Sequence, residues 1–173
     1  MIICIEGADG VGKTSVAESL GLPVVSFPNY LTETGKIIRQ VLRGAIRMDP
    51  LVFQCLQTVN KLETTVHGDT ILCRYWPSAY VYGVLDGLPR QWLMDVHKGM
   101  KADRYILLDA SAESCAGRQT ARGGQREMYE GRIGKTQRIR ELYLELWHNM
   151  RWPIVDAERP LESVIQDVKA LTL

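Results

Sequence analysis

The sequence has little cysteine, little net charge and no long hydrophobic run. Its four cysteines are widely spaced and form no Cys-x-x-Cys pair, so we expect neither a zinc site nor a thiol-exchange centre. Because 21 basic residues face 20 acidic ones, the net charge of +1 supplies no basic field for a nucleic-acid or membrane partner. No apolar segment approaches the ~20 residues that span a bilayer, and the N-terminus lacks the pattern of a signal peptide. We therefore expect a cytoplasmic protein with no nucleic-acid and no membrane partner.

The chain is long enough and apolar enough to bury a core, since 46% of its 173 residues are hydrophobic. Short apolar runs, typical of strands buried on both faces, alternate with longer segments of helical periodicity. This alternation predicts an α/β fold in which residues 1–173 form one domain, with a five-stranded parallel sheet between two layers of helices. The predicted strands are Ile2–Ile5, Val24–Ser26, Thr70–Cys73, Tyr105–Leu108 and Pro153–Val155. The predicted helices are Lys13–Leu20, Glu33–Leu42, Pro50–Val66, Arg90–Lys98, Ala112–Gln119, Lys135–Met150 and Leu161–Leu171.

One stretch interrupts the alternation of strands and helices. The segment Thr120–Gly134 contains four glycines and three arginines, and it has too few apolar residues to pack firmly. We expect a flexible lid over about residues 119–134.

The most informative motif follows the first predicted strand. The segment Gly7-Ala8-Asp9-Gly10-Val11-Gly12-Lys13-Thr14 matches G-x-x-x-x-G-K-[ST] at every defined position and opens a predicted helix. Such a loop directs backbone N–H groups at phosphate oxygens, while its lysine contacts the β and γ oxygens and its hydroxyl binds Mg²⁺. This predicts a three-layer P-loop NTPase fold with ATP as the donor and Mg²⁺ at Thr14. The residues predicted to bind ATP here are Gly7, Gly10, Val11, Gly12, Lys13, Thr14 and Ser15.

Other residues bear on the acceptor of the phosphoryl group. Asp9 places a carboxylate inside the phosphate loop, where it is better suited to a sugar hydroxyl than to a phosphate. Arg74 follows the third predicted strand at the carboxyl edge of the sheet, where ligands bind in α/β folds. Arg122 and Arg126 lie in the lid, and their charges would stabilise a transferring phosphoryl group when the lid closes over the substrates. We predict Lys13, Arg74, Arg122 and Arg126 as the catalytic residues.

With these features the sequence resembles the thymidylate kinases over nearly its whole length. The resemblance rests on the order and spacing of short segments rather than on any one of them beyond the phosphate loop. They are Glu6–Thr14, Phe27-Pro28 followed by Thr32–Lys36, Leu51–Phe53, Arg74-Tyr75 with Ser78, Arg118–Glu130, and Val155-Asp156-Ala157. Thymidylate kinases transfer the γ-phosphoryl group of ATP to dTMP. The resemblance therefore implies a nucleoside monophosphate kinase that forms dTDP.

The resemblance also implies roles for individual residues. Asp9 would receive the deoxyribose 3′-hydroxyl group, Phe53 would stack on the acceptor base, and Arg74 would hold the acceptor phosphate. Tyr82 would line the pocket of the acceptor base, and Arg118 would lie along the adenine of the donor. The resemblance further places Phe27 and Tyr129 at the acceptor, and Asp156 and Ala157 at ATP. We also predict Gln57 at the acceptor, although there it departs from the family pattern. Relatives are homodimers through helices, and an apolar stripe formed by Leu51, Cys55, Val59 and Leu62 is compatible with a homodimer.

Three positions depart from the family pattern. Cys73 stands where relatives have an aspartate that organises Mg²⁺. Tyr30 stands where they have an arginine for the acceptor phosphate, which Arg39 or Arg43 could replace. Where relatives have a thymine-recognising arginine, the helix offers four polar side chains instead. These are Gln54, Gln57, Asn60 and Lys61. We expect dTMP as the leading acceptor, with altered or broadened base choice.

Two alternatives remain open at this stage. A deoxynucleoside kinase shares the fold, but it needs a carboxylate general base after the second strand, where this chain has Phe27-Pro28-Asn29-Tyr30. The second alternative is a nucleotide-binding module whose catalysis is weakened because Cys73 replaces the aspartate of the family.

Overall fold

The computed structural model describes residues 1–122 and 133–172, and its centre is a five-stranded sheet in the order β2-β3-β1-β4-β5. Every neighbouring pair of strands is parallel, with Ile3 beside Ile71 on one side of β1 and beside Arg104 on the other. The strands are β1 (Ile2–Glu6), β2 (Val24–Ser26), β3 (Thr70–Cys73), β4 (Arg104–Asp109) and β5 (Ile154–Asp156). The predicted α/β fold and parallel sheet are confirmed, and β5 begins and ends one residue later than predicted.

Helices surround this sheet, as predicted. They are α1 (Lys13–Glu18), α2 (Glu33–Leu42), α3 (Pro50–Glu63), α4 (Trp76–Leu85), α5 (Arg90–Val96), α6 (Ala112–Arg122), α7 (Ile133–Met150) and α8 (Leu161–Thr172). Two boundaries differ at the predicted lid, because α6 continues to Arg122 and α7 already begins at Ile133. The rest of the predicted lid lies outside the described residues.

The sequence pattern did not predict α4. Its residues Trp76–Gly83 are all buried, so the helix has apolar and aromatic side chains all round instead of one apolar stripe. The helix packs against α3, α5 and α7, which explains why every side of it is covered.

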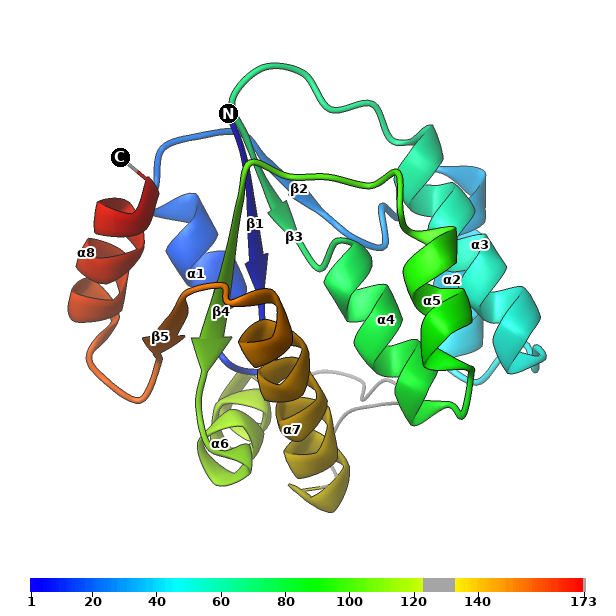
Figure 1. The fold of residues 1–173 in the computed structure, drawn as a ribbon. Helices are drawn as coiled ribbons and strands as arrows, with labels where there is room; N and C mark the ends of the chain where they lie inside the picture. Colours follow the sequence, from blue (N-terminus) through cyan, green and yellow to red (C-terminus); the bar gives the residue numbers. More distant parts are fainter. Residues whose placement is uncertain (123–132, 173) are drawn as a thin grey trace.

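Figure 1 shows α1 and α8 on one side of the sheet and α4 with α5 on the other, with α2 and α3 beyond α4. Side chains of β1, β3 and β4 fill the core between these layers; those under 2% exposed include Ile5, Ile71 and Leu107. All strands run the same way, so their carboxyl ends share one edge, at the bottom of Figure 1. The segment after β1, Arg74 after β3 and helix α6 after β4 therefore meet there. None of the helices in the described part of the chain has the length and hydropathy of a membrane span.

Candidate active site

The phosphate loop, Gly7–Thr14, joins β1 to α1 at the carboxyl edge of the sheet. Lys13, the first residue of α1, is only 6% exposed, and its ammonium donates hydrogen bonds to the Gly7 and Ala8 carbonyl oxygens at 2.7 and 2.8 Å. The lysine is thus held against its own loop, within reach of anything that the loop binds. This is the arrangement that the motif predicts for a phosphate-binding lysine.

Helix α6 packs directly on this loop. Gly10 has a φ of +88°, and a Cβ atom there would lie 2.3 Å from the Cys115 carbonyl oxygen of α6. The Gln119 side chain donates to the Asp9 carbonyl oxygen at 2.7 Å, and Arg118 donates to the Val11 carbonyl oxygen at 3.0 Å. Helix α6 therefore occupies the space that a side chain at position 10 would need.

Sequence reasoning missed Gln119, which it placed only at the border of the lid. The contact with the loop depends on how α6 docks, and no local pattern in the sequence reports that docking. The one available signal is the neighbouring Arg118, which was predicted at the site.

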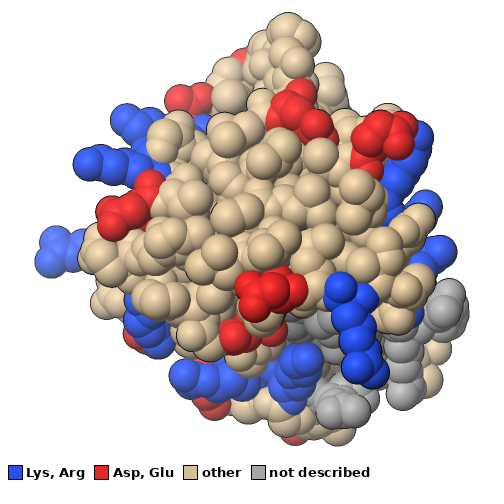
Figure 2. Space-filling view, turned by 90° about the vertical axis from the view of Figure 1, so that its right-hand side faces the viewer, with Lys and Arg blue, Asp and Glu red and all other residues tan. Residues whose placement is uncertain are grey.

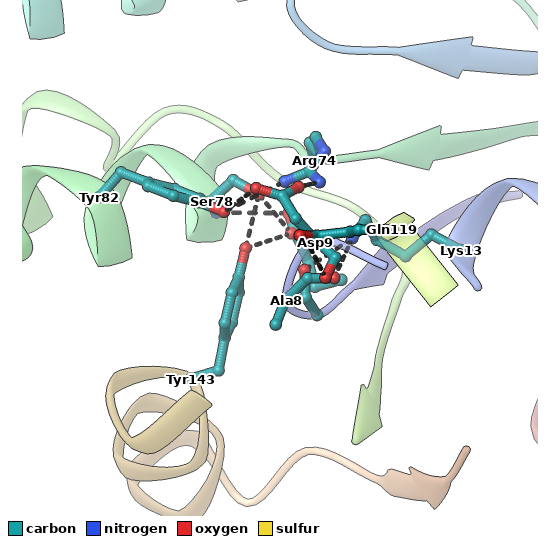
Figure 3. Close-up of polar contacts among 10 residues, drawn as sticks. Ala8, Asp9, Lys13, Arg74, Ser78, Tyr82, Gln119 and Tyr143 are labelled. Carbon is teal, nitrogen blue, oxygen red and sulfur yellow. Dashed lines mark hydrogen bonds and ion pairs between the residues drawn. The ribbon is translucent and has the colours of Figure 1, made fainter. Parts of the chain in front are cut away.

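An ion pair joins the phosphate loop to the segment after β3 at the main cavity. The Arg74 guanidinium is paired with the Asp9 carboxylate, and the Tyr82 hydroxyl donates to Asp9 Oδ2 at 3.0 Å (Figure 3). Three predicted acceptor residues from the loop, the end of β3 and α4 therefore meet at one place. A carboxylate held in this way keeps further lone pairs for a ligand hydroxyl group.

The backbone of Arg74 is strained. Its φ is +62°, and among the described residues only Arg151 is another non-glycine residue with positive φ. Such conformations persist where surrounding contacts enforce them, and they are concentrated at functional sites. Although burial opposes the charge of Arg74, the neighbouring Tyr82, Tyr143 and Glu6 side chains raise its pKa overall. Arg74 therefore stays a fixed cation.

A buried network of hydrogen bonds lies next to the Asp9–Arg74 ion pair. Glu6 is fully buried, and its Oε2 accepts hydrogen bonds from the Ser78 hydroxyl at 2.6 Å and from the Tyr143 hydroxyl at 3.1 Å. Figure 3 shows Ser78 from α4 and Tyr143 from α7 pointing toward one another beside Asp9. The network ties β1, α4 and α7 together, which holds the acceptor side of the cavity in place.

The main cavity has a volume of about 790 Å³ and extends from the phosphate loop to α3 and α4. It is lined by many of the predicted site residues, namely Asp9, Gly10, Gly12, Lys13, Thr14, Ser15, Phe27, Gln57, Arg74, Tyr82 and Arg118. Phe53, predicted to stack on the acceptor base, is buried in the core and does not belong to this lining. The α3 side chains that reach the lining are Gln57 and, one turn later, Lys61.

A second cavity of about 220 Å³ lies on the other side of the phosphate loop, between the start of α1 and α8. Val11 and Ala157 line it, and Arg118 lines both cavities. The Arg118 guanidinium donates to the Ala157 carbonyl oxygen at 2.8 Å, so these two predicted residues are neighbours. Asp156 points elsewhere, since its Oδ1 accepts from the Glu158 backbone N–H at 2.9 Å.

Several predictions concern the lid. Arg126 and Tyr129 lie outside the described residues. Arg122 is the last residue of α6, and its side chain is likewise not described. Their roles stay predictions.

Cys73 ends β3 beside the main cavity. Burial raises the pKa of its thiol to about 11, so at neutral pH the group is uncharged. A neutral thiol is a poor ligand for Mg²⁺, which prefers oxygen. Within residues 1–122 and 133–172, no cluster of three or more His, Cys, Asp or Glu residues could hold a metal ion.

The other two departures from the family pattern also have a structural setting. Tyr30 lines the main cavity, and the Arg39 guanidinium lies over its ring at 4.6 Å from the centroid. Asn60 does not face the cavity, because its side chain accepts from the Asn29 backbone N–H at 2.8 Å and donates to the Thr32 hydroxyl at 2.9 Å. It anchors the segment after β2.

Comparisons with known proteins agree on one family. The family model described as thymidylate kinase matches residues 5–168. The thymidylate kinase of Dictyostelium discoideum is 29% identical over 190 residues, which cover 99% of this chain and 84% of the relative. That of Caenorhabditis elegans is 26% identical, covering 97% and 88%. A solved structure of the thymidylate kinase from Candida albicans, described as having broad substrate specificity, superposes with a TM-score of 0.77 at 22% identity, covering 98% of this chain and 89% of that one.

Proposed function

The chain belongs to the thymidylate kinase family, and we propose how its own side chains perform the reaction of that family. It transfers the γ-phosphoryl group of ATP to dTMP, which releases ADP and dTDP. A phosphate oxygen of dTMP forms a bond to the γ-phosphorus while the bond from that phosphorus to the β-phosphate oxygen of ATP breaks. The observation that supports this account is a single cavity lined both by the phosphate loop, with Lys13 and Thr14, and by Arg74 and Tyr82, which contact the loop residue Asp9.

On the donor side, the phosphate loop binds the triphosphate of ATP. Lys13 exchanges its hydrogen bonds to the Gly7 and Ala8 carbonyl oxygens for bonds to the β and γ oxygens, because charged oxygens are stronger acceptors. The adenine base occupies the second cavity, where Arg118 and Ala157 are neighbours. Arg118, which lines both cavities, then lies between adenine and phosphates.

On the acceptor side, Arg74 binds the dTMP phosphate and Asp9 accepts a hydrogen bond from the 3′-hydroxyl group. Arg74 suits this role because it is a permanent cation held by its backbone and by Asp9. The base lies deeper in the cavity, between α3, α4 and the segment after β2, where Gln57, Ala79 and Phe27 line it. Tyr82 closes the sugar end.

The phosphate of dTMP needs no general base, because the second pKa of a phosphate monoester is about 6 and the attacking oxygen is already ionised. A nucleoside hydroxyl group needs one. Among the described residues that line the cavity, Asp9 is the one carboxylate, and it is paired with Arg74. This observation favours a nucleotide over a nucleoside as the acceptor.

Arg122 and Arg126 of the lid supply positive charge to the transferring phosphoryl group when both nucleotides are bound. Closure would also exclude water, which competes as an acceptor and wastes ATP. The argument is electrostatic: of the described residues that line the main cavity near the phosphate loop, Lys13, Arg74 and Arg118 are the cations.

The residues present fit a Mg²⁺ ion that has few protein ligands. Thr14 lines the cavity beside Lys13, while the Cys73 thiol is neutral and Asp9 is paired with Arg74. Mg²⁺ commonly keeps several waters and needs few protein ligands besides phosphate oxygens. We propose that Thr14 would hold Mg²⁺ together with the phosphates of ATP, and that the metal would supply charge neutralisation there.

The α3 face suits a homodimer. Leu51, Val59 and Leu62 are 45%, 47% and 68% exposed, and Cys55 is exposed between them. Figure 2 shows this side of the molecule as a largely uncharged area with both basic and acidic side chains around it. Sedimentation of the purified chain tests the dimer. The single-domain organisation and a cytoplasmic location stay predictions from the sequence.

Product analysis tests the function directly. Purified protein is mixed with ATP and Mg²⁺ together with dTMP, thymidine or no acceptor, and the nucleotides are separated. We expect ADP and dTDP in equal amounts with dTMP and little ADP otherwise. ADP formation with thymidine would instead establish a nucleoside kinase, and ADP formation without acceptor would establish an NTPase.

A further inference from the structure

The Gln119 side chain of α6 contacts the phosphate loop at one peptide bond, the one between Asp9 and Gly10. Its Nε2 donates to the Asp9 carbonyl oxygen at 2.7 Å, and the side chain lines the main cavity (Figure 3). A Cβ atom at Gly10 would lie 2.9 Å from the Gln119 Cγ atom, so the same side chain also packs against Gly10. Gln119 therefore touches both residues that this peptide bond joins.

The orientation of the Asp9–Gly10 peptide decides which of its polar groups a phosphate meets. The peptide is trans, and in a trans peptide the C=O and the N–H point in nearly opposite directions. Because the carbonyl oxygen of Asp9 points at Gln119, the N–H of Gly10 points away from it, and Gly10 itself lines the main cavity. Phosphate loops bind phosphate oxygens through such N–H groups. The observed orientation thus leaves a donor for ATP.

The opposite orientation of this peptide is accessible because of Gly10. A glycine adopts φ on either side of zero without steric cost, so a peptide next to it can rotate. Rotation would turn the Asp9 carbonyl oxygen toward the phosphates, where two acceptors repel each other. Arg74 and Tyr82 hold the Asp9 carboxylate, which leaves the peptide itself unrestrained. The hydrogen bond from Gln119 acts on the peptide directly.

The oxygen of the Gln119 amide shows that stability alone does not explain this residue. Its Oε1 atom is buried and has no hydrogen-bond partner among residues 1–122 and 133–172. A buried acceptor without a partner destabilises a fold. A methionine has a similar length and would avoid that cost. The amide is therefore better explained by its donor, which holds the loop.

Building on the proposed function, we propose that Gln119 is a positioning residue for the phosphate donor. Its amide holds the Asp9–Gly10 peptide in the orientation that directs the Gly10 N–H at a phosphate oxygen of ATP. Gln119 acts through the loop, and the acceptor side does not depend on it, because Arg74 and Tyr82 already hold the Asp9 carboxylate.

Binding measurements test this role with two variants of Gln119. Gln119→Met keeps the length of the side chain without its N–H donor, and Gln119→Asn keeps the amide but is one methylene shorter. Gln91→Met is the matched control, since the amide of Gln91 also donates a hydrogen bond but lies on the exposed surface of α5. Titration calorimetry with Mg²⁺ present should show a dissociation constant for ATP about 10- to 100-fold higher in both Gln119 variants, as expected when a hydrogen bond to a charged group is lost. The dissociation constant for dTMP should change less than about threefold, and Gln91→Met should match the wild type with both nucleotides.

Two further readouts separate a positioning role from a merely structural one. The free energy of unfolding of Gln119→Met, from chemical denaturation, should be no lower than that of the wild type, because the variant lacks the buried Oε1 atom. In the two-dimensional proton–nitrogen NMR spectrum, ATP should shift the amide proton of Gly10 downfield in the wild type. Saturating ATP should shift it far less in Gln119→Met.

The outcomes distinguish this proposal from the proposed function. Wild-type affinity for ATP in the Gln119 variants, or equal losses with ATP and dTMP, would overturn the role of Gln119. A Gly10 shift that is the same in Gln119→Met would do so too, because Gln119 would then not act through the loop. If Gln119→Met does not fold, Gln119→Asn decides by the same two readouts, nucleotide affinity and the Gly10 shift. A wild type that binds ATP and dTMP but forms no dTDP would refute the proposed function, while the binding comparison would still decide on Gln119.

Discussion

The packing of α6 against the phosphate loop predicts that Gly10→Ala lowers catalysis as well as stability. An alanine at a φ of +88° costs about 1–2 kcal/mol from the left-handed backbone alone. In addition, its Cβ atom would lie 2.3 Å from the Cys115 carbonyl oxygen, where ordinary contact begins near 3.4 Å. Loop and helix must therefore separate by about 1 Å. Because a displacement of this size at a catalytic group can cost about 100-fold in rate, we expect kcat/KM for ATP to fall by that order.

A matched control is available at Gly87, which follows α4. Its φ is +87°, and a Cβ atom there has nothing within 4 Å. Gly87→Ala should thus lose the same 1–2 kcal/mol in free energy of unfolding, by chemical denaturation, while keeping wild-type kinetics. If both variants lose the same stability and Gly10→Ala retains wild-type kcat/KM for ATP, the close packing of α6 on the loop does not position the catalytic groups, and the reasoning fails.

Four further predictions concern single side chains. Asp9→Asn should lower kcat/KM for dTMP about 10- to 100-fold but hardly change kcat/KM for the analogue of dTMP that lacks the 3′-hydroxyl group. Equal losses with both substrates would show that Asp9 does not bind the 3′-hydroxyl group. Cys73→Ala should keep kcat and the Mg²⁺ titration within about threefold of the wild type, because a thiol with a pKa of about 11 does not bind the metal; a raised Mg²⁺ requirement would contradict this. Lys61→Met should raise the free energy of unfolding by up to about 3 kcal/mol at pH 7, because burial lowers the pKa of Lys61 from 10.5 to about 8. Below pH 8 the buried ammonium is charged and destabilises the wild-type fold. The stability gain of the variant should vanish above about pH 10.5, where the lysine is neutral in both the folded and the unfolded chain. Arg122→Ala and Arg126→Ala should each lower kcat far more than ATP affinity measured by calorimetry, and a parallel loss of both would exclude a role confined to the transition state.

Local patterns predicted those parts of the molecule that depend on neighbouring residues. The five short apolar strands and the phosphate loop each have a signature within about ten residues, and the structure has them at or within one residue of the predicted places. Helix α4 has no such signature, because burial on every side removes the apolar stripe that marks a helix. Its existence becomes apparent only when α3, α5 and α7 are in place around it.

The base-facing side of α3 shows the same limit at the level of single residues. Phe53, Gln57 and Lys61 lie one turn apart on one helix face, so spacing alone cannot tell which of them reaches the cavity. The packing of α3 against α2 and α4 decides this, and it places Phe53 in the core and Gln57 and Lys61 at the lining. The Gln119 contact with Asp9 likewise depends on the docking of α6, more than 100 residues away in sequence.

Binding of a bisubstrate molecule tests the central claim most directly. In this molecule adenosine and thymidine are joined through their 5′ positions by a chain of five phosphates, so it spans the second cavity, the phosphate loop and the acceptor end at once. Titration calorimetry should give a dissociation constant at least about 100-fold lower than that of ATP or of dTMP alone, and Asp9→Asn should remove much of this gain. An affinity no better than that of ATP, unchanged in Asp9→Asn, would mean that the acceptor nucleotide is not held opposite the phosphate loop.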